Sequence, residues 1–377
     1  MSRERESLRP RERVEIALNH QEPDRCPLQI SFTPEFGRRL SSAMGFTLGF
    51  DSPAIRSDFS LERAAGCDLL LTYLGWAQAH NYQDQEPSPG SFYTDEWGVE
   101  WQAGEYKTRY GSGRYFRIVK HPLATENTEE ALAFYVPPDP LYPGLYAPVE
   151  RVIKQFKEAY FIVAGLAATI FETAWALRGF EQVLKDMVIN PDLAERLFEI
   201  PFQYHWKAAC RLVELGVDMI LLADDVAGER QMLISPSMWR RFLKPRLAAL
   251  IKKCKQLNSR LRIAYHSDGH VLPIIPDLIE IGVDVLNPVE PSCLDLKRLK
   301  REYGDNLSFW GTVDHRITLT WKTPEEVEAE VVERLKTVGK GGGLIISPTH
   351  PVRVDTPLEN FWAFVNAVHR HRYENAG

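Results

Sequence analysis

The chain has 377 residues, of which 44% are hydrophobic and 25% are charged, and its formal net charge is −6. This composition is typical of a globular protein with a large core, and the lack of a basic block argues against nucleic acid or an anionic membrane as partner. No run of about 18 apolar residues occurs, so no membrane-spanning helix is expected. The charged first residues do not resemble a secretory signal, and the five cysteines are scattered without a CxxC pair. These features favour a cytoplasmic protein without a disulfide framework.

Helix-like and strand-like segments alternate along the chain. An amphipathic helix is expected from Pro10 to His20, and a long helix from Pro191 to Leu215 is expected to break at Pro201. Further helices are expected to start at the Ser-Pro or Thr-Pro pairs of residues 235–236, 323–324 and 356–357. Eight short apolar runs read as buried strands, at residues 27–31, 68–74, 161–166, 217–223, 261–267, 283–290, 307–313 and 342–348.

Buried strands that are separated by helices predict a parallel sheet. Eight such units favour a closed (β/α)8 barrel of the TIM type, and no GxGxxG follows the first strand to support a dinucleotide fold. We expect one domain over residues 1–377. Residues 77–143 interrupt the alternation with a stretch rich in Tyr, Trp, Pro and Gly, which reads as an insertion with one or two β-hairpins. Its Trp97 and Trp101 are candidates for a substrate-pocket wall, and core packing is an equally good interpretation.

Polar residues follow the strands from the fourth to the eighth, at the end where TIM-barrel active sites lie. A ring of such residues predicts a polar cavity with a chemical role, although any one of them could simply cap a helix. Of the neighbours Asp224 and Asp225, only one is expected to face the cavity. The candidates are Asp224, Asp225, His266, Asp268, Glu290, Asp314, His315 and His350.

His266 and Asp268 share a face of the fifth strand, and His350 ends the eighth. A His–Asp–His set with open positions is typical of catalytic zinc or iron(II) sites, so these three are the predicted metal ligands. A hydrogen-bonded His/Asp network without metal is the alternative. Asp225, Glu290 and His350 are the candidate catalytic groups, and Asp224, Trp97, Asp314 and His315 the candidate substrate contacts.

Several segments resemble the uroporphyrinogen decarboxylase superfamily, which also contains zinc-dependent methyltransferases that serve corrinoid proteins. They are RERVEIALNHQEPDRCPL, DEWGVEW, LADDVAGERQMLISPSMW, HSDGHVLPIIPDLIEIGVDVLNPVEP and SPTHPVRVDTPLEN. The resemblance implies a distorted TIM barrel with a central polar cleft.

The two branches of the superfamily differ in the residues that they place in this cleft. Decarboxylases carry an arginine-rich Gln-Ala-Gly-Arg segment after the first strand, where this chain has SFTPEFGRRL, with Arg38 and Arg39 out of pattern. The spacing from His350 to Thr356-Pro357 does match their final Gly-His-Gly segment. The methyltransferases hold zinc with His-x-Cys and a later Cys. His266 matches the first ligand, while Asp268 and His350 stand at the cysteine positions.

The resemblance thus implies a methyltransferase that demethylates a small, possibly methoxylated, compound and transfers the methyl group to a corrinoid-carrying partner protein. A divalent metal, with zinc as the first choice, would polarise an oxygen of the substrate. The first alternative is a metal-free decarboxylase of a tetrapyrrole or another carboxylated aromatic compound. The second is a non-catalytic protein that binds a small molecule or a cobamide. A homodimer is compatible with such a barrel, although nothing in the sequence specifies one.

Overall fold

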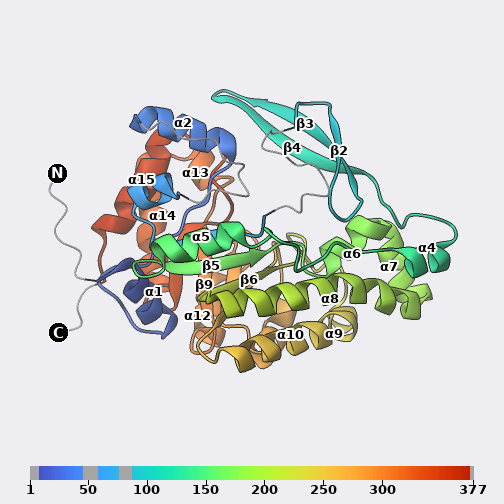
Figure 1. Cartoon of the computed structure of the whole chain (residues 1–377). Helices are drawn as coiled ribbons and strands as arrows, with labels where there is room; N and C mark the ends of the chain where they lie inside the picture. Colours follow the sequence, from blue (N-terminus) through green and yellow to red (C-terminus); the bar gives the residue numbers. More distant parts are fainter. Residues whose placement is uncertain (1–7, 46–57, 76–86, 374–377) are drawn as a thin grey trace.

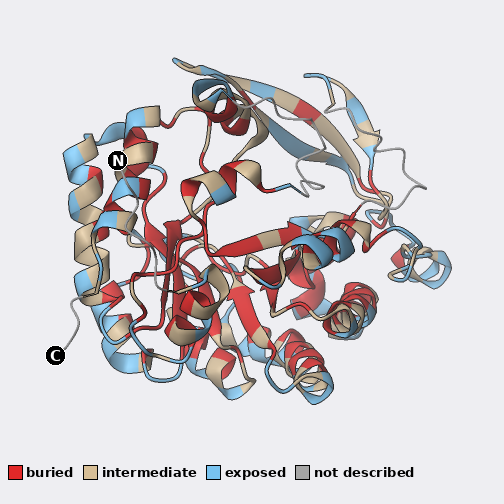
Figure 2. Ribbon diagram, turned by 60° about the vertical axis from the view of Figure 1, so that its left-hand side comes forward, coloured by how far each residue is buried: buried red, intermediate tan, exposed pale blue. Residues whose placement is uncertain are grey.

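The fold is a parallel α/β barrel, as the sequence predicts, in a computed structural model that describes residues 8–45, 58–75 and 87–373. Seven parallel strands form one curled sheet in the order β1-β5-β6-β7-β8-β9-β10. Figure 2 shows these strands almost wholly buried. Their bounds are β1 Leu69–Tyr73, β5 Phe161–Leu166, β6 Met219–Ala223, β7 Arg262–His266, β8 Val285–Val289, β9 Ser308–Val313 and β10 Leu344–Pro348.

An extended segment around Leu28 closes the ring between β10 and β1. Leu28 and Phe32 form isolated parallel bridges with Ile346 and Val352. On the other side, the Leu28 carbonyl accepts the N–H of Asp68 at 2.8 Å. The sequence predicts a regular strand over residues 27–31, and the structure has these bridges instead, since Pro27 has no N–H to donate. The barrel therefore has eight positions and seven regular strands.

The interior of the barrel is filled from its amino end. Inward side chains of successive strands, such as Phe161, Met219 and Trp310, form one buried cluster. Val14 and Leu18 of α1 pack into the same cluster, so this helix plugs the amino end of the barrel. Packing of this kind leaves the carboxyl end of the strands as the place for a polar site.

Helices cover the outside of the ring (Figure 1). In the second half of the chain, Ser235 and Thr323 cap α9 and α14 as expected, with their side chains accepting N–H groups. The bounds are α1 Pro10–Leu18, α2 Pro34–Met44, α3 Ser60–Ala65, α5 Ala147–Phe156, α6 Phe171–Arg178, α7 Phe180–Ile189, α8 Pro191–Leu215, α9 Pro236–Phe242, α10 Lys244–Leu257, α11 Ile275–Glu280, α12 Leu296–Tyr303, α13 Thr318–Trp321, α14 Pro324–Thr337 and α15 Leu358–Arg370.

Some helix predictions need correction. Helix α8 runs through Pro201 without a break, because its buried face packs along the barrel and tertiary packing outweighs local propensity. Helix α15 starts at Leu358 with Pro357 as its N-cap, so Thr356 does not cap it. Helices α2 and α7 were not predicted, although Thr33-Pro34 at the start of α2 is the same kind of signal that marks α9.

The insertion forms an antiparallel sheet of β2 Phe92–Thr94, β3 Glu100–Thr108 and β4 Gly111–Lys120, followed by α4 Thr128–Phe134. Figure 1 shows this sheet standing apart from the ring. The tip of the β3–β4 hairpin nevertheless reaches the opposite rim of the barrel. There the guanidinium carbon of Arg39 lies 4.1 Å from the ring centroid of Tyr110, and Arg39 donates to the carbonyls of Val354 and Thr356.

A buried ion network occupies the amino end of the barrel. Asp68 is fully buried and accepts hydrogen bonds from both Arg13 and Arg25, each at 2.6 Å. Arg13 also donates to Asp24, at 2.6 and 2.8 Å. Every charge in this network therefore has an opposite charge in contact with it.

None of the helices in the described ranges is both long and apolar enough to cross a membrane.

Candidate metal and substrate site

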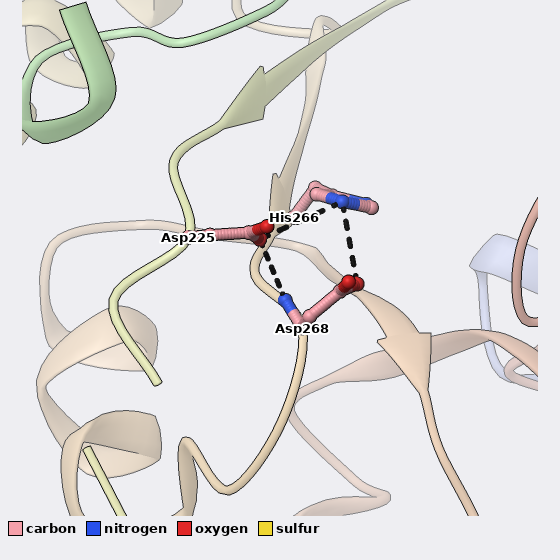
Figure 3. A group of neighbouring side chains, drawn as sticks. All are labelled: Asp225, His266 and Asp268. Carbon is pink, nitrogen blue, oxygen red and sulfur yellow. Dashed lines mark hydrogen bonds and ion pairs between the residues drawn. The ribbon is translucent and has the colours of Figure 1, made fainter. Parts of the chain in front are cut away.

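Three of the predicted residues converge at the carboxyl ends of β6 and β7. Figure 3 shows Asp225, His266 and Asp268 around one point, and one ligand atom of each lies within 4.8 Å of the others. His266 Nε2 lies 3.8 Å from Asp225 Oδ1 and 3.6 Å from Asp268 Oδ1. Asp225 Oδ1 also accepts the N–H of Asp268 at 2.8 Å, which fixes the loop after β7 against the end of β6.

The orientation of the His266 ring comes from Asn287, at the end of the neighbouring strand β8. His266 Nδ1 lies 2.6 Å from Asn287 Oδ1, while the amide nitrogen of Asn287 donates to the carbonyl of Trp310. The Asn287 oxygen can only accept, so His266 Nδ1 carries the proton. The lone pair of Nε2 consequently faces the two carboxylates, as in a metal-ligating histidine with a fixed tautomer.

His350 contacts the cluster but is not a member of the compact group. Its Nε2 lies 2.9 Å from Asp268 Oδ2. Its ring stacks on that of His315 with centroids 4.7 Å apart, and His315 Nδ1 is 2.9 Å from Thr349 Oγ1. His350 remains a predicted ligand: it reaches Asp268 from β10, which lies three positions around the ring from β7.

The electrostatics of the group follow from these contacts. Burial raises the pKa of Asp225, and the neighbouring Asp268 charge adds to this. Burial also opposes ionisation of Asp268, but the hydrogen bond and charge of His350 outweigh it and lower the pKa of this carboxyl. Burial together with the charge of His350 lowers the pKa of His315 to about 4, so His315 is neutral at physiological pH.

These residues fit a divalent cation. Asp268 Oδ1 is buried and has no hydrogen-bond partner among the described residues. A buried carboxylate oxygen without a donor is costly unless a cation or water satisfies it. The donor set of one imidazole nitrogen and carboxylate oxygens suits zinc, iron(II) or manganese. His266, Asp268 and Asp225 are the residues that could hold such an ion.

Two of the predicted substrate contacts accept backbone N–H groups in the structure. Asp224 is fully buried, and its carboxylate accepts the N–H groups of Ile170, Phe171 and Glu172 at 2.8–3.1 Å. Asp314 Oδ1 accepts the N–H groups of Arg316 and Ile317, which fixes the turn after β9. Asp224 is thus held by backbone groups on both of its oxygens, whereas Asp225 is the member of the pair that faces the cluster.

Glu290 lies beside the cluster rather than in it. Its Oε2 accepts the N–H of Gly269 at 2.9 Å, and its Oε1 lies 3.9 Å from Arg316. Glu290 therefore supports the loop that carries Asp268. Glu172 was missed by the sequence analysis. Its Oε2 accepts the N–H of Asp225 at 3.2 Å, and burial next to Asp224 and Asp225 raises its pKa to about 8.

Trp97 both packs against the hydrophobic core and lines a cavity beside the cluster. The cavity, of about 360 Å³, lies between the turn before β3, the ends of β1 and β5, and helices α6 and α8. Glu172 belongs to its wall and touches Asp225 from there. Trp101 also lines this cavity, and its indole N–H donates to Asp95 at 2.7 Å. The cavity and the carboxylate cluster are thus neighbours, connected by the hydrogen bond between Glu172 and the N–H of Asp225.

Comparisons with known proteins agree with this architecture. A methylcobamide:CoM methyltransferase MtaA of Methanosarcina barkeri is 29% identical over 206 residues, which are 55% of this chain and 57% of that protein. A uroporphyrinogen decarboxylase of Coxiella burnetii is 25% identical over 171 residues, or 43% of each chain. The chain thus matches about half the length of these curated relatives.

The similarity in fold extends further. A solved methyltransferase from Methanosarcina mazei has a TM-score of 0.70 and 22% identity, over 97% of this chain and 99% of that one. This likeness shows a common fold. The family model described as uroporphyrinogen decarboxylase (URO-D) matches residues 99–371. The chain therefore belongs to the uroporphyrinogen decarboxylase family.

Proposed function

We propose that the protein is a metal-dependent methyltransferase that removes a methyl group from a small methylated compound, such as a methyl ether, and transfers it to a corrinoid protein. The observation that carries this proposal is the buried Asp268 oxygen without a hydrogen-bond partner, which lies 3.6 Å from the free nitrogen of His266. The similarity to a methylcobamide:CoM methyltransferase supports the methyl-transfer chemistry and the corrinoid partner.

A divalent metal at His266, Asp268 and Asp225 would act as a Lewis acid toward the substrate oxygen, which makes it a better leaving group. Asn287 keeps the proton on His266 Nδ1, so Nε2 stays available as a ligand. His350 holds Asp268 Oδ2, which leaves Oδ1 directed at the cluster. His315 stacks on His350 and limits its rotation.

Decarboxylation of a polyacidic tetrapyrrole is less well supported. Such a substrate requires several cations around it, and the cavity beside the cluster is lined by Asp95, Glu96 and Glu172 with no Lys or Arg among its described residues. A purely ligand-binding protein would be indicated by tight binding without turnover.

The test is metal content by elemental analysis of the purified chain, compared with His266→Ala and Glu105→Gln. Glu105 is exposed on β3 and serves as the matched control. We expect about one zinc or iron per chain, lost in His266→Ala and retained in the control. Methyl transfer from methoxylated compounds to a cob(I)amide acceptor should be detected in the variants that retain the metal and be lost in His266→Ala. A chain without bound metal even after reconstitution would contradict the proposal.

A further inference from the structure

The cavity beside the cluster has an unusual wall. Five aromatic rings line it, and they come from four separate parts of the chain: β1, the insertion, α6 and α8. The rings are those of Tyr73, Trp97, Trp101, Trp175 and Tyr204. Aromatic faces carry negative electrostatic potential and attract cations as well as apolar groups.

The charged groups in this wall are all acidic. Asp95 is engaged within the protein, where it accepts the N–H groups of Trp97 and Val99 at 2.9 and 3.0 Å. Glu96 is different, because its Oε2 is buried and has no hydrogen-bond partner among the described residues. The remaining basic candidate, His205, is buried, and this lowers its pKa to about 4, so it supplies no positive charge at neutral pH.

Burial raises the pKa of Glu96 to about 7, so a positive charge in the cavity would stabilise its ionised form. Glu96 shares the cavity wall with the aromatic rings, and both would interact favourably with a cation. A neutral aromatic ligand would fill the cavity but leave Glu96 unpaired. An anionic ligand would find no Lys or Arg among the described residues of the wall. A small organic cation would satisfy both the rings and Glu96.

We propose that this cavity binds the substituted-ammonium group of a small organic cation. The inference rests on the proposed function in one respect: the ligand would be the methyl donor, with its reacting oxygen at the cluster and its ammonium group held in the cavity. The two sites adjoin at Glu172, which lines the cavity and accepts the backbone N–H of Asp225. The substrate class is then a methylated compound that also carries an ammonium group.

The experiment compares two probes of the same shape by isothermal titration calorimetry on the full chain at neutral pH. Choline carries a quaternary ammonium group, and 3,3-dimethylbutan-1-ol has carbon in place of the nitrogen. We expect choline to bind at least about tenfold more tightly, because only the cation gains from the rings and Glu96. Equal affinities would overturn the proposal. So would tighter binding of methoxybenzene than of choline, which would indicate a site for neutral aromatic rings.

Substitutions in the cavity wall test whether choline binds in this cavity. Glu96→Gln keeps the shape of the side chain and removes its charge, so we expect about a tenfold loss of choline affinity, with no loss in Glu105→Gln. If Glu96→Gln does not fold, Trp175→Leu tests the wall from α6, with the same expected direction. Wild-type affinity in the folded variant would overturn the proposal.

The titrations are run on both metal-loaded and chelator-treated protein, so that the two proposals fail separately. A chain that binds metal at His266 but shows no preference for choline would contradict only the ammonium inference. A chain that prefers choline but never binds metal would contradict the proposed methyl transfer.

Discussion

The two ends of the barrel differ in how their buried charged side chains are paired. At the amino end, Asp68 is held by Arg13 and Arg25, and the network has no unpaired member. At the carboxyl end, Asp225 and Asp268 carry like charges close together, and Asp268 Oδ1 has no hydrogen-bond partner among the described residues.

This difference separates stability from function. Charges that are fully paired inside a protein destabilise it strongly when one partner is removed. Charges that are left unpaired are retained at a cost, which is expected only where a ligand or a reaction uses them. The amino end therefore holds the barrel together, while the carboxyl end is arranged for something that binds.

The largest expected effect is at the amino end. Asp68→Asn leaves Arg13 and Arg25 buried with less counter-charge, and should lower the free energy of unfolding by about 3–5 kcal/mol. Urea denaturation followed by circular dichroism measures this. Glu129→Gln breaks the exposed ion pair with Arg196 and should have no measurable effect. A change in the free energy of unfolding well below this range would mean that the paired charges at the amino end do not stabilise the barrel.

An acid-dependent effect is expected at the wall of the cavity. His205 Nδ1 donates to the Pro201 carbonyl at 2.9 Å, and burial lowers the pKa of His205 from 6.5 to about 4. The unfolded chain therefore takes up this proton first, and stability is lost as the pH falls from 6.5 toward 4. Between pH 7 and pH 5 this loss should be about 2 kcal/mol.

The comparison with His205→Gln isolates that contribution. The variant loses the stacking of His205 on Trp97 and should be less stable than wild type at pH 7. Because the variant has no proton to take up, the difference should narrow by about 2 kcal/mol at pH 5. A difference that is independent of pH would mean that His205 is protonated equally in both states.

Asp268→Asn is the counterpart of Asp68→Asn at the carboxyl end. It removes the pairing with His350 and also the repulsion of Asp225, so the two changes oppose one another. We expect the free energy of unfolding to change by less than about 1 kcal/mol while metal binding is lost. Denaturation and elemental analysis on the same preparation measure both. A destabilisation as large as that of Asp68→Asn would show that the cluster is structural.

The smallest change in stability is expected where the β3–β4 hairpin contacts the barrel, at Tyr110 and Arg39. Tyr110→Leu removes the ring over which Arg39 lies, at a partly exposed position. The loss should be about 0.5 kcal/mol, and Tyr110→Phe, which retains a ring, should be close to wild type. Thermal melts of the two variants give the difference. A larger loss in Tyr110→Leu would mean that the hairpin contributes to the stability of the barrel itself.

Much of the fold can be predicted from the sequence because each strand is a short and mostly apolar run. The seven regular strands lie within the segments that were predicted. The errors occur where tertiary packing outweighs local signals, as for Pro201 inside α8. Helix α7 follows α6 with only Gly179 between them, and the sequence predicts the first of these helices but not the second.

The candidate site also has features that the sequence predicts and features that depend on tertiary contacts. Local spacing brings His266 and Asp268 to one strand end, and the structure does place them together. Local spacing cannot show that Asp224 turns away to accept three backbone N–H groups while Asp225 faces the cluster. The roles of Glu172 and Asn287 depend on contacts between neighbouring strands and loops, which no short-range pattern encodes.

The seam of the barrel has a consequence for how the chain is made. Leu28 meets Ile346, and the Cys26 thiol reaches the carbonyl of Leu344, so the ring closes through residues more than three hundred positions apart. During synthesis on a ribosome, the segment around Leu28 therefore has no β10 to pair with until almost the whole chain has been made. Contacts of such long range slow folding and prolong the exposure of apolar strand edges. The ring therefore cannot close before β10 has been synthesised.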